Sequence, residues 1–149
     1  MGISTLPRDF KEFLRLLNSK QVEYLLVGGY AVGYYGYPRA TADIDVWIAV
    51  SDENAGRVVE ALREFGFTVP DLTPELFLQK DRVVRMGVPP VRIEIITSAS
   101  GVDFAECYAR RVVTEVDGIP VSLIELGDLK KNKKAAGRPK DLADLDQLA

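Results

Sequence analysis

Leu25-Leu26-Val27-Gly28-Gly29-Tyr30-Ala31-Val32, followed by Arg39-Ala40-Thr41-Ala42-Asp43-Ile44-Asp45-Val46-Trp47-Ile48, is the stretch on which the fold depends. Residues 24–27 form an apolar run typical of a strand that is covered on both faces. Gly28-Gly29 permits a tight turn and a close approach of backbone to a ligand, because neither residue has a Cβ atom. We expect a short helix to begin near Tyr30, with N-terminal N–H groups that suit a phosphate.

Two aspartates, Asp43 and Asp45, lie two residues apart in the second apolar run, residues 43–48. Side chains alternate along a strand, so both carboxylates face the same way, about 6.6 Å apart. Like charges on one face repel unless a cation lies between them, and Mg²⁺ accepts one or two carboxylates together with phosphate oxygens and water. An exposed polar strand face is the alternative, but the neighbouring residues are too apolar for an edge strand. The pair therefore predicts a divalent metal site.

The spacing of these motifs resembles a known signature. Gly28-Gly29 followed by Asp43-x-Asp45 is similar to the signature of the nucleotidyltransferase superfamily with the DNA polymerase β-like fold. Within that superfamily the chain most resembles the small stand-alone bacterial proteins related to AbiEii-type toxins of toxin–antitoxin and phage-defence systems. The resemblance runs from about Tyr24 to the C-terminus. It implies that Mg²⁺ or Mn²⁺ is the cofactor and that the glycines approach the phosphates of a nucleotide.

Arg39 and Thr41, which precede the two aspartates, extend the motif. Arg39-x-Thr41-x-Asp43-x-Asp45 matches a pattern that is frequent in small nucleotidyltransferases of this kind. Thr41 precedes Asp43 by two positions, so it is expected on the same face, at the rim of the site. Arg39 is expected to neutralise a phosphate, and the alternative is a solvated loop arginine.

A third acid is expected from residues 91–96, which alternate as a strand with Arg92 and Glu94 on the face opposite the apolar positions. The resemblance implies that this strand neighbours the Asp43-x-Asp45 strand. It also implies that Glu94 completes the metal site and takes the proton of the attacking hydroxyl. Close relatives usually carry an aspartate here, so Glu94 is longer by one methylene. The alternative is an ion pair of Glu94 with Arg92 or across the strands, on an exposed face.

The C-terminal segment carries Lys134 and Arg138, followed by Asp141 and Asp144. AbiEii-like nucleotidyltransferases have a similar Lys-x-x-x-Arg followed by Lys-Asp and a further Asp. A lysine point charge and a bidentate arginine fork suit contacts to a triphosphate or ribose. The alternative is a solvated basic helix end, favoured by the helix dipole. We prefer that alternative for the other lysines of the segment, which are Lys130, Lys131 and Lys133.

The amino-acid composition excludes several classes of function and of site. The chain has 149 residues, is 47% hydrophobic and 28% charged, and carries a net charge of −3. These values predict one domain, residues 1–149, and argue against a mainly electrostatic nucleic-acid binder. The single cysteine, Cys107, excludes an internal disulfide and fits a reducing cytoplasm. No apolar run is long enough to span a membrane. With no histidine, histidine zinc sites, Ser-His-Asp triads and histidine bases are excluded.

The remaining pattern predicts helices alternating with strands. Apolar spacing and capping residues indicate helices over 7–18, 53–65, 104–108, 124–136 and 140–148, with a short one over 74–79. Strands are expected over 82–86, 91–96, 111–116 and 119–122, the last two joined by an Asp117-Gly118 turn. The predicted fold class is α/β (α+β), a small mixed sheet flanked by helices, like the polymerase β-type nucleotidyltransferase core.

These features predict a metal-dependent nucleotidyltransferase. It would move a nucleoside monophosphate from an NTP such as ATP to an acceptor hydroxyl on a protein or an RNA, within a toxin–antitoxin or phage-defence system. The alternative is a catalytically weak NTP-binding or partner-binding protein of a toxin–antitoxin pair, with a cognate toxin or antitoxin chain as its partner. A purely structural α/β domain would require the glycines, the three acids and the basic pair to coincide by chance.

Overall fold

A six-stranded mixed sheet organises the chain. The computed structural model describes residues 6–36, 41–88 and 90–148. In chain order the elements are α1 (Arg8–Ser19), β1 (Tyr24–Val27), α2 (Gly28–Tyr35), β2 (Asp43–Ile48), α3 (Asp52–Phe65), a 3-10 helix η1 (Pro74–Phe77), β3 (Val83–Met86), β4 (Arg92–Ile96), α4 (Phe104–Ala109), β5 (Val112–Val116), β6 (Ile119–Leu123), α5 (Leu126–Ala136) and α6 (Pro139–Gln147).

The strand order is β3-β4-β2-β1-β6-β5. Three pairs are antiparallel: β1 with β2, β3 with β4, and β5 with β6. The pairs β2–β4 and β1–β6 are parallel. The predicted fold class, a mixed sheet flanked by helices, is confirmed. Strand β2 lies inside the sheet, as its apolar composition predicted.

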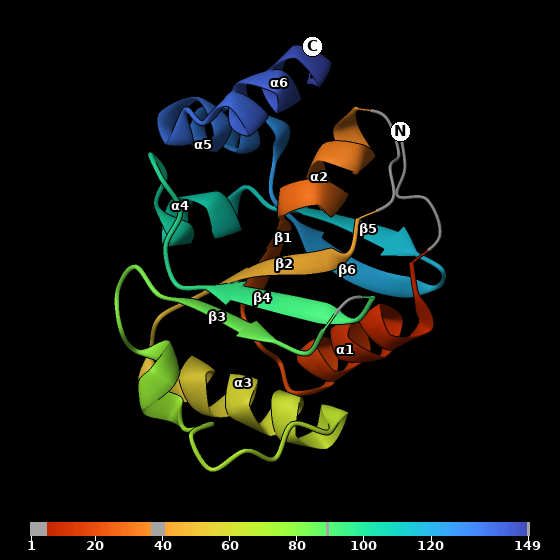
Figure 1. Ribbon diagram of the computed structural model, residues 1–149, viewed down its shortest axis with the longest axis vertical. Coiled ribbons are helices and arrows are strands. Elements are labelled where there is room, and N and C mark those ends of the chain that lie inside the picture. The colour runs from red at the N-terminus through yellow and green to blue at the C-terminus, as the bar shows by residue number, and fades with distance from the viewer. Residues whose placement is uncertain (1–5, 37–40, 89, 149) are drawn as a thin grey trace.

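Helices cover both faces of the sheet. In Figure 1, α1 and α3 lie on one side, whereas α2, α4, α5 and α6 lie on the other. Alternate residues of β2, Ile44, Val46 and Ile48, are fully buried. On the opposite face Trp47 is 1% exposed and packs edge-on against Phe104 of α4, with ring centroids 5.2 Å apart. That second face is therefore closed at the carboxyl end of β2, while Asp43 and Asp45 lie nearer its amino end.

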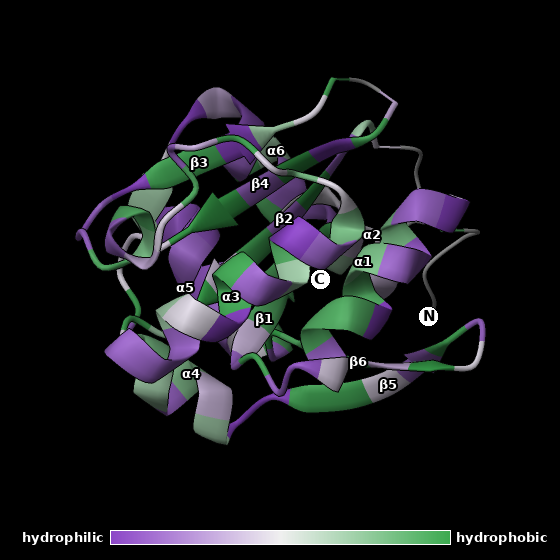
Figure 2. Cartoon of the chain, turned by 90° about the horizontal axis from the view of Figure 1, so that it is seen from below, coloured by the Kyte–Doolittle hydropathy of each residue, from purple (hydrophilic) through white to green (hydrophobic). Residues whose placement is uncertain are grey.

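Hydropathy follows this layering. Figure 2 shows hydrophobic residues along the central strands, with hydrophilic segments interrupting β4 and covering outer turns of the helices. All four residues of β1 are buried, as a strand between two neighbours and two helical layers requires. Within the residues that the structure describes, no helix combines the length and the apolar character needed to cross a bilayer.

Local signals set several element ends. The predicted helix ends at residues 65 and 136 are confirmed, whereas α5 begins at Leu126 instead of residue 124 and α6 at Pro139 instead of residue 140. The Ser51 side chain accepts a hydrogen bond from the backbone N–H of Asn54 and caps α3. Gly66 ends that helix with φ of 127°. Asp117 and Gly118 both have positive φ, 51° and 80°, which is the conformation of the predicted type I′ hairpin turn. Gly137 ends α5 in the left-handed conformation, and Pro139 begins α6 two residues later.

Candidate active site

The three predicted acids meet on one face of β2 and β4. The parallel register sets Asp45 beside Glu94 and Asp43 beside Arg92. Because residues two apart share a face, these four side chains form two neighbouring rows. The expectation that Glu94 lies on the strand next to Asp43-x-Asp45 is confirmed as geometry, whereas its catalytic role stays a prediction.

Asp43 is bound by an arginine. The Arg92 guanidinium donates from Nε to Asp43 Oδ1 at 2.8 Å and from Nη2 to Oδ2 at 2.9 Å. This bidentate pair is the strongest geometry available to two such side chains. It holds the pKa of Asp43 below its usual value, outweighing the opposing effect of burial. Asp43 is therefore ionised in this arrangement.

Glu94 is bound from the other side. Arg85 of β3 lies opposite Glu94 in the antiparallel register, and its Nε donates to Glu94 Oε1 at 2.9 Å. The Glu94 side chain is 17% exposed and that of Arg85 is 60% exposed. The cross-strand ion pair considered from the sequence is thus present, but its carboxylate is largely buried beside Asp45. Such a pair with an exposed arginine contributes little to stability.

Asp45 lies between these two ion pairs and faces carboxylates. Burial raises its pKa most, and the neighbouring Glu94 and Asp43 raise it further, to about 7; Lys140 acts in the opposite direction. A carboxyl group that holds its proton near neutral pH lacks a positive charge in contact with it. The acid cluster (Asp43, Asp45 and Glu94) is therefore short of positive charge at its most buried member.

The double glycine fits against this acid. Gly28 has φ of +70°, and a Cβ added there would lie 2.1 Å from Asp45 Oδ2. At Gly29 an added Cβ would lie 3.1 Å from Thr41 Oγ1, so Thr41 is next to the second glycine as well as two residues before Asp43. The group that lies close to Gly28 is the Asp45 carboxylate of the chain itself, whereas the predicted approach of the glycine backbone to a ligand stays a prediction. Arg39 lies outside the described residues.

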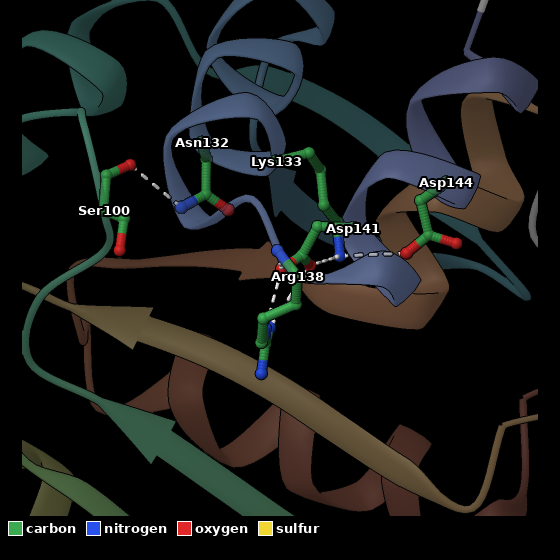
Figure 3. Close-up of polar contacts among 6 residues, drawn as sticks. All are labelled: Ser100, Asn132, Lys133, Arg138, Asp141 and Asp144. Carbon is green, nitrogen blue, oxygen red and sulfur yellow. Dashed lines mark hydrogen bonds and ion pairs between the residues drawn. The ribbon is translucent and has the colours of Figure 1, made fainter.

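Basic side chains from the start of α6 lie over the acid cluster. Figure 3 shows Arg138 extending from the N-terminal end of α6 toward the strands; its pKa is raised first by Asp141, to which it is hydrogen-bonded, and least by Glu94. Lys140 lowers the pKa of both Asp43 and Asp45. Arg138 is hydrogen-bonded to Asp141 and extends toward the sheet, and its predicted role at a nucleotide stays a prediction. Sequence reasoning missed Lys140, and the only signal for it was the Lys-Asp pair in the tail.

Lys133, not Lys134, is the lysine that turns inward, which corrects our preference for a solvated Lys133. Lys133 is 6% exposed, and its Nζ lies 3.3 Å from Asp141 Oδ1 and 3.0 Å from Asp144 Oδ2 (Figure 3). Asp141 also accepts from the backbone N–H and from Nε of Arg138, at 3.2 and 2.7 Å. This helix cluster (Lys133, Asp141 and Asp144) joins α5 to α6. Lys134 is exposed.

The acid cluster suits a hard divalent cation in its chemistry. Carboxylate oxygens are the ligands that Mg²⁺ and Mn²⁺ prefer. The raised pKa of Asp45 shows where positive charge is lacking, and the missing Cβ of Gly28 lets the Asp45 carboxylate lie against the backbone there. As the side chains lie, however, no group of three or more acidic or thiol side chains among residues 6–36, 41–88 and 90–148 is arranged to hold a metal. Asp43 points at Arg92, so three-acid ligation requires that pair to open.

Comparison with known proteins gives a likeness of fold. No protein-family model matches the chain, and no curated protein matches it. The structure is similar to a solved structure from Thermotoga maritima, of a protein proposed to be a nucleotidyltransferase. The TM-score is 0.58 at 16% sequence identity, over 93% of this chain and 89% of that one. At this identity the likeness shows a shared fold across nearly the whole chain.

Proposed function

We propose that this protein is a metal-dependent nucleotidyltransferase, which moves a nucleoside monophosphate from an NTP to an acceptor hydroxyl and releases pyrophosphate. The observation that carries the proposal is the position of Asp45, buried against Gly28 and between two further carboxylates, with a pKa raised to about 7. Three acids on one face repel one another and destabilise the fold unless cations neutralise them, and Arg92 and Arg85 do so for Asp43 and Glu94. The shared fold with the Thermotoga maritima protein supports the same class.

Asp43, Asp45 and Glu94 would hold Mg²⁺ or Mn²⁺. When bound, such an ion neutralises charge on the attacking and leaving oxygens and activates the acceptor hydroxyl. Glu94 is the carboxylate proposed to take the hydroxyl proton. The longer side chain relative to the usual aspartate is accommodated here by its pairing across to Arg85.

The rest of the site would bind the nucleotide. Gly28 and Gly29 begin α2, so the backbone N–H groups of that turn are proposed to contact phosphate. Arg138 and Lys140 would neutralise charge that develops on the phosphates. Thr41 lies at the rim, beside Gly29. For Lys134 and Arg39 the proposal rests on the sequence resemblance, and the same holds for an acceptor on a protein or RNA and for a cognate toxin or antitoxin partner.

A thermal-shift screen against the four NTPs with Mg²⁺, run beside Asp43→Ala, tests nucleotide binding. A nucleotide present at about one hundred times its dissociation constant should raise the Tm by about 5–10 °C. That rise should require Mg²⁺ and should vanish in Asp43→Ala. If none of the four NTPs changed the Tm in the presence of Mg²⁺, the proposal would be contradicted.

Transfer itself is tested by incubating the protein with α-labelled NTP and mixed RNA or protein acceptors. Label should pass to an acceptor with the wild type and not with Asp45→Asn. Exposed Glu53, which pairs with Arg57 within α3, supplies a control, since Glu53→Gln should transfer label normally.

The two arginine pairs favour a second candidate, a protein that binds NTP or a partner without transfer. Arg92 and Arg85 already neutralise Asp43 and Glu94, which is the arrangement expected if neither acid serves a metal. Under this candidate the thermal shift would persist while no label moves to any acceptor.

A further inference from the structure

The Arg92–Asp43 pair occupies the carboxylate oxygens with which Asp43 would coordinate a metal. Both carboxylate oxygens of Asp43 accept from one guanidinium, at 2.8 and 2.9 Å. A divalent cation placed on the same carboxylate would lie close to that guanidinium, and two positive groups at such a distance repel strongly. Asp43 can therefore bind either Arg92 or the cation strongly, but not both at once.

Arg92 is placed so that it can leave Asp43. It lies near the start of β4, and its side chain is 37% exposed, against 20% for Asp43. An arginine tip in contact with solvent changes rotamer without disturbing a packed core. The planar fork that grips two carboxylate oxygens grips two phosphate oxygens equally well. An incoming triphosphate would offer that fork a more highly charged partner than Asp43.

We infer that Arg92 is a phosphate-binding residue of the nucleotide site, kept on Asp43 until a nucleotide arrives. This inference rests on the proposed function and adds an order of events to it. Phosphate draws Arg92 off Asp43, and the freed carboxylate then completes the metal site. Metal and nucleotide would consequently bind together, each making the other's binding tighter, because both depend on opening the same ion pair.

The structure supplies a matched control. Arg110, the residue directly after α4, binds Asp128 of α5 in the same way, from Nε and Nη2 at 3.0 and 2.9 Å, and Asp128 is 2% exposed. That pair joins two helices and includes none of the acids of the proposed metal site. Arg110→Gln removes the same kind of contact as Arg92→Gln and reports the general effect of breaking such a pair.

The test measures binding of Mn²⁺ alone, by loss of the electron paramagnetic resonance signal of free Mn²⁺, and binding of NTP in the presence of Mn²⁺. Arg92→Gln should bind Mn²⁺ alone about tenfold more tightly and NTP about tenfold more weakly, each change corresponding to about 1.4 kcal/mol. Arg92→Lys keeps the charge without the fork, so its NTP affinity should lie between those of the wild type and Arg92→Gln. Arg110→Gln should leave both affinities unchanged while lowering the Tm.

The opposing results are distinct. If wild-type protein binds NTP but Arg92→Gln and Arg92→Lys bind it equally well, Arg92 is a permanent partner of Asp43 and the inference is wrong. Unchanged affinity for Mn²⁺ alone in Arg92→Gln would also overturn it, because the pair would then not compete with the metal. If the wild type itself binds no NTP, the proposed function fails, and the inference fails with it.

Discussion

Aspartates gather in two clusters, one buried between helices and one half-buried on the sheet, and the charges of the two clusters are balanced in opposite ways. In the helix cluster, Asp141 and Asp144 are 1% and 3% exposed, and Lys133 lies between them. The pKa of Asp141 is held below its usual value, first by Arg138 and then by Lys133. In the acid cluster on the sheet, Asp45 faces two carboxylates, and its pKa is raised to about 7.

The difference separates acids that are neutralised within the fold from acids that we propose to be functional. The helix cluster carries its own buried cation, so its charges are satisfied within the fold, and its effect is to fix α6 against α5. That fixing sets where Arg138 and Lys140 begin α6 over the sheet. The acid cluster is short of a cation at its centre, which is expected where a ligand supplies the charge.

The largest expected effect comes from Lys133→Met. This change leaves Asp141 and Asp144 buried without the lysine between them, and breaking a buried ion pair from one side costs about 3–5 kcal/mol. Urea denaturation measures the loss in the free energy of unfolding. Exposed Lys134 is the matched control, because Lys134→Met should change that free energy by less than about 0.5 kcal/mol. Equal effects for the two lysines would remove the distinction between the clusters.

The pH dependence of stability should differ in sign between the clusters. Asp45 has a folded-state pKa of about 7 against an unfolded value of 3.8, so its contribution is fully present below pH 4 and is lost as pH rises through 7. Asp141 has a lowered pKa, so its contribution is present above its unfolded value and is lost on acidification.

Asp45→Asn isolates the first of these contributions. Between pH 4 and 8 and without metal, the wild type should lose up to about 4 kcal/mol relative to Asp45→Asn, from the shift in pKa. Denaturation midpoints at a series of pH values measure it. Parallel curves for the two proteins would show that Asp45 titrates normally.

A smaller difference in stability is expected when one glycine of each region is replaced by alanine. Gly28 and Gly137 have φ of +70° and +66°, so an alanine costs about 1–2 kcal/mol at either from backbone strain. An added Cβ at Gly137 meets its nearest atom at 3.6 Å, but at Gly28 it meets Asp45 Oδ2 at 2.1 Å. Gly28→Ala should therefore cost about 1–3 kcal/mol more than Gly137→Ala in thermal unfolding. Equal costs would mean that Asp45 moves aside freely.

Much of the site was predictable from the sequence because its signals are local. Asp43 and Asp45 share a face by strand alternation, and the glycines before them imply close approach. Glu94 could be assigned to the neighbouring strand only through the family resemblance. Its register beside Asp45 is a tertiary fact, and so are the arginines that neutralise Asp43 and Glu94 from β4 and β3.

The C-terminal helices show where sequence reasoning failed. In α5 several lysines stand close together, so the residue types alone do not show that Lys133 lies on the buried face of the helix and Lys134 on the exposed face. The stripe was nevertheless readable by spacing: Leu129 is 0% exposed, and Lys133 follows it by one helical turn. A lysine that lies on the apolar face of a helix, and that is followed by Asp141 and Asp144 in the next helix, indicates a buried ion pair. Lys140 gave no such signal, because its place depends on how α6 lies over the sheet.

The most direct test of the account is the pKa of Asp45, measured by NMR on protein with ¹³C-labelled aspartate carboxyls and assigned with Asp45→Asn. Without metal we predict a pKa of about 7. With saturating Mg²⁺ the same carboxyl should stay ionised to well below its usual pKa, because the cation supplies the missing positive charge. Asp141 should titrate identically in both conditions. A pKa near the ordinary value for aspartate, unchanged by Mg²⁺, would contradict the claim that the acid cluster is a metal site.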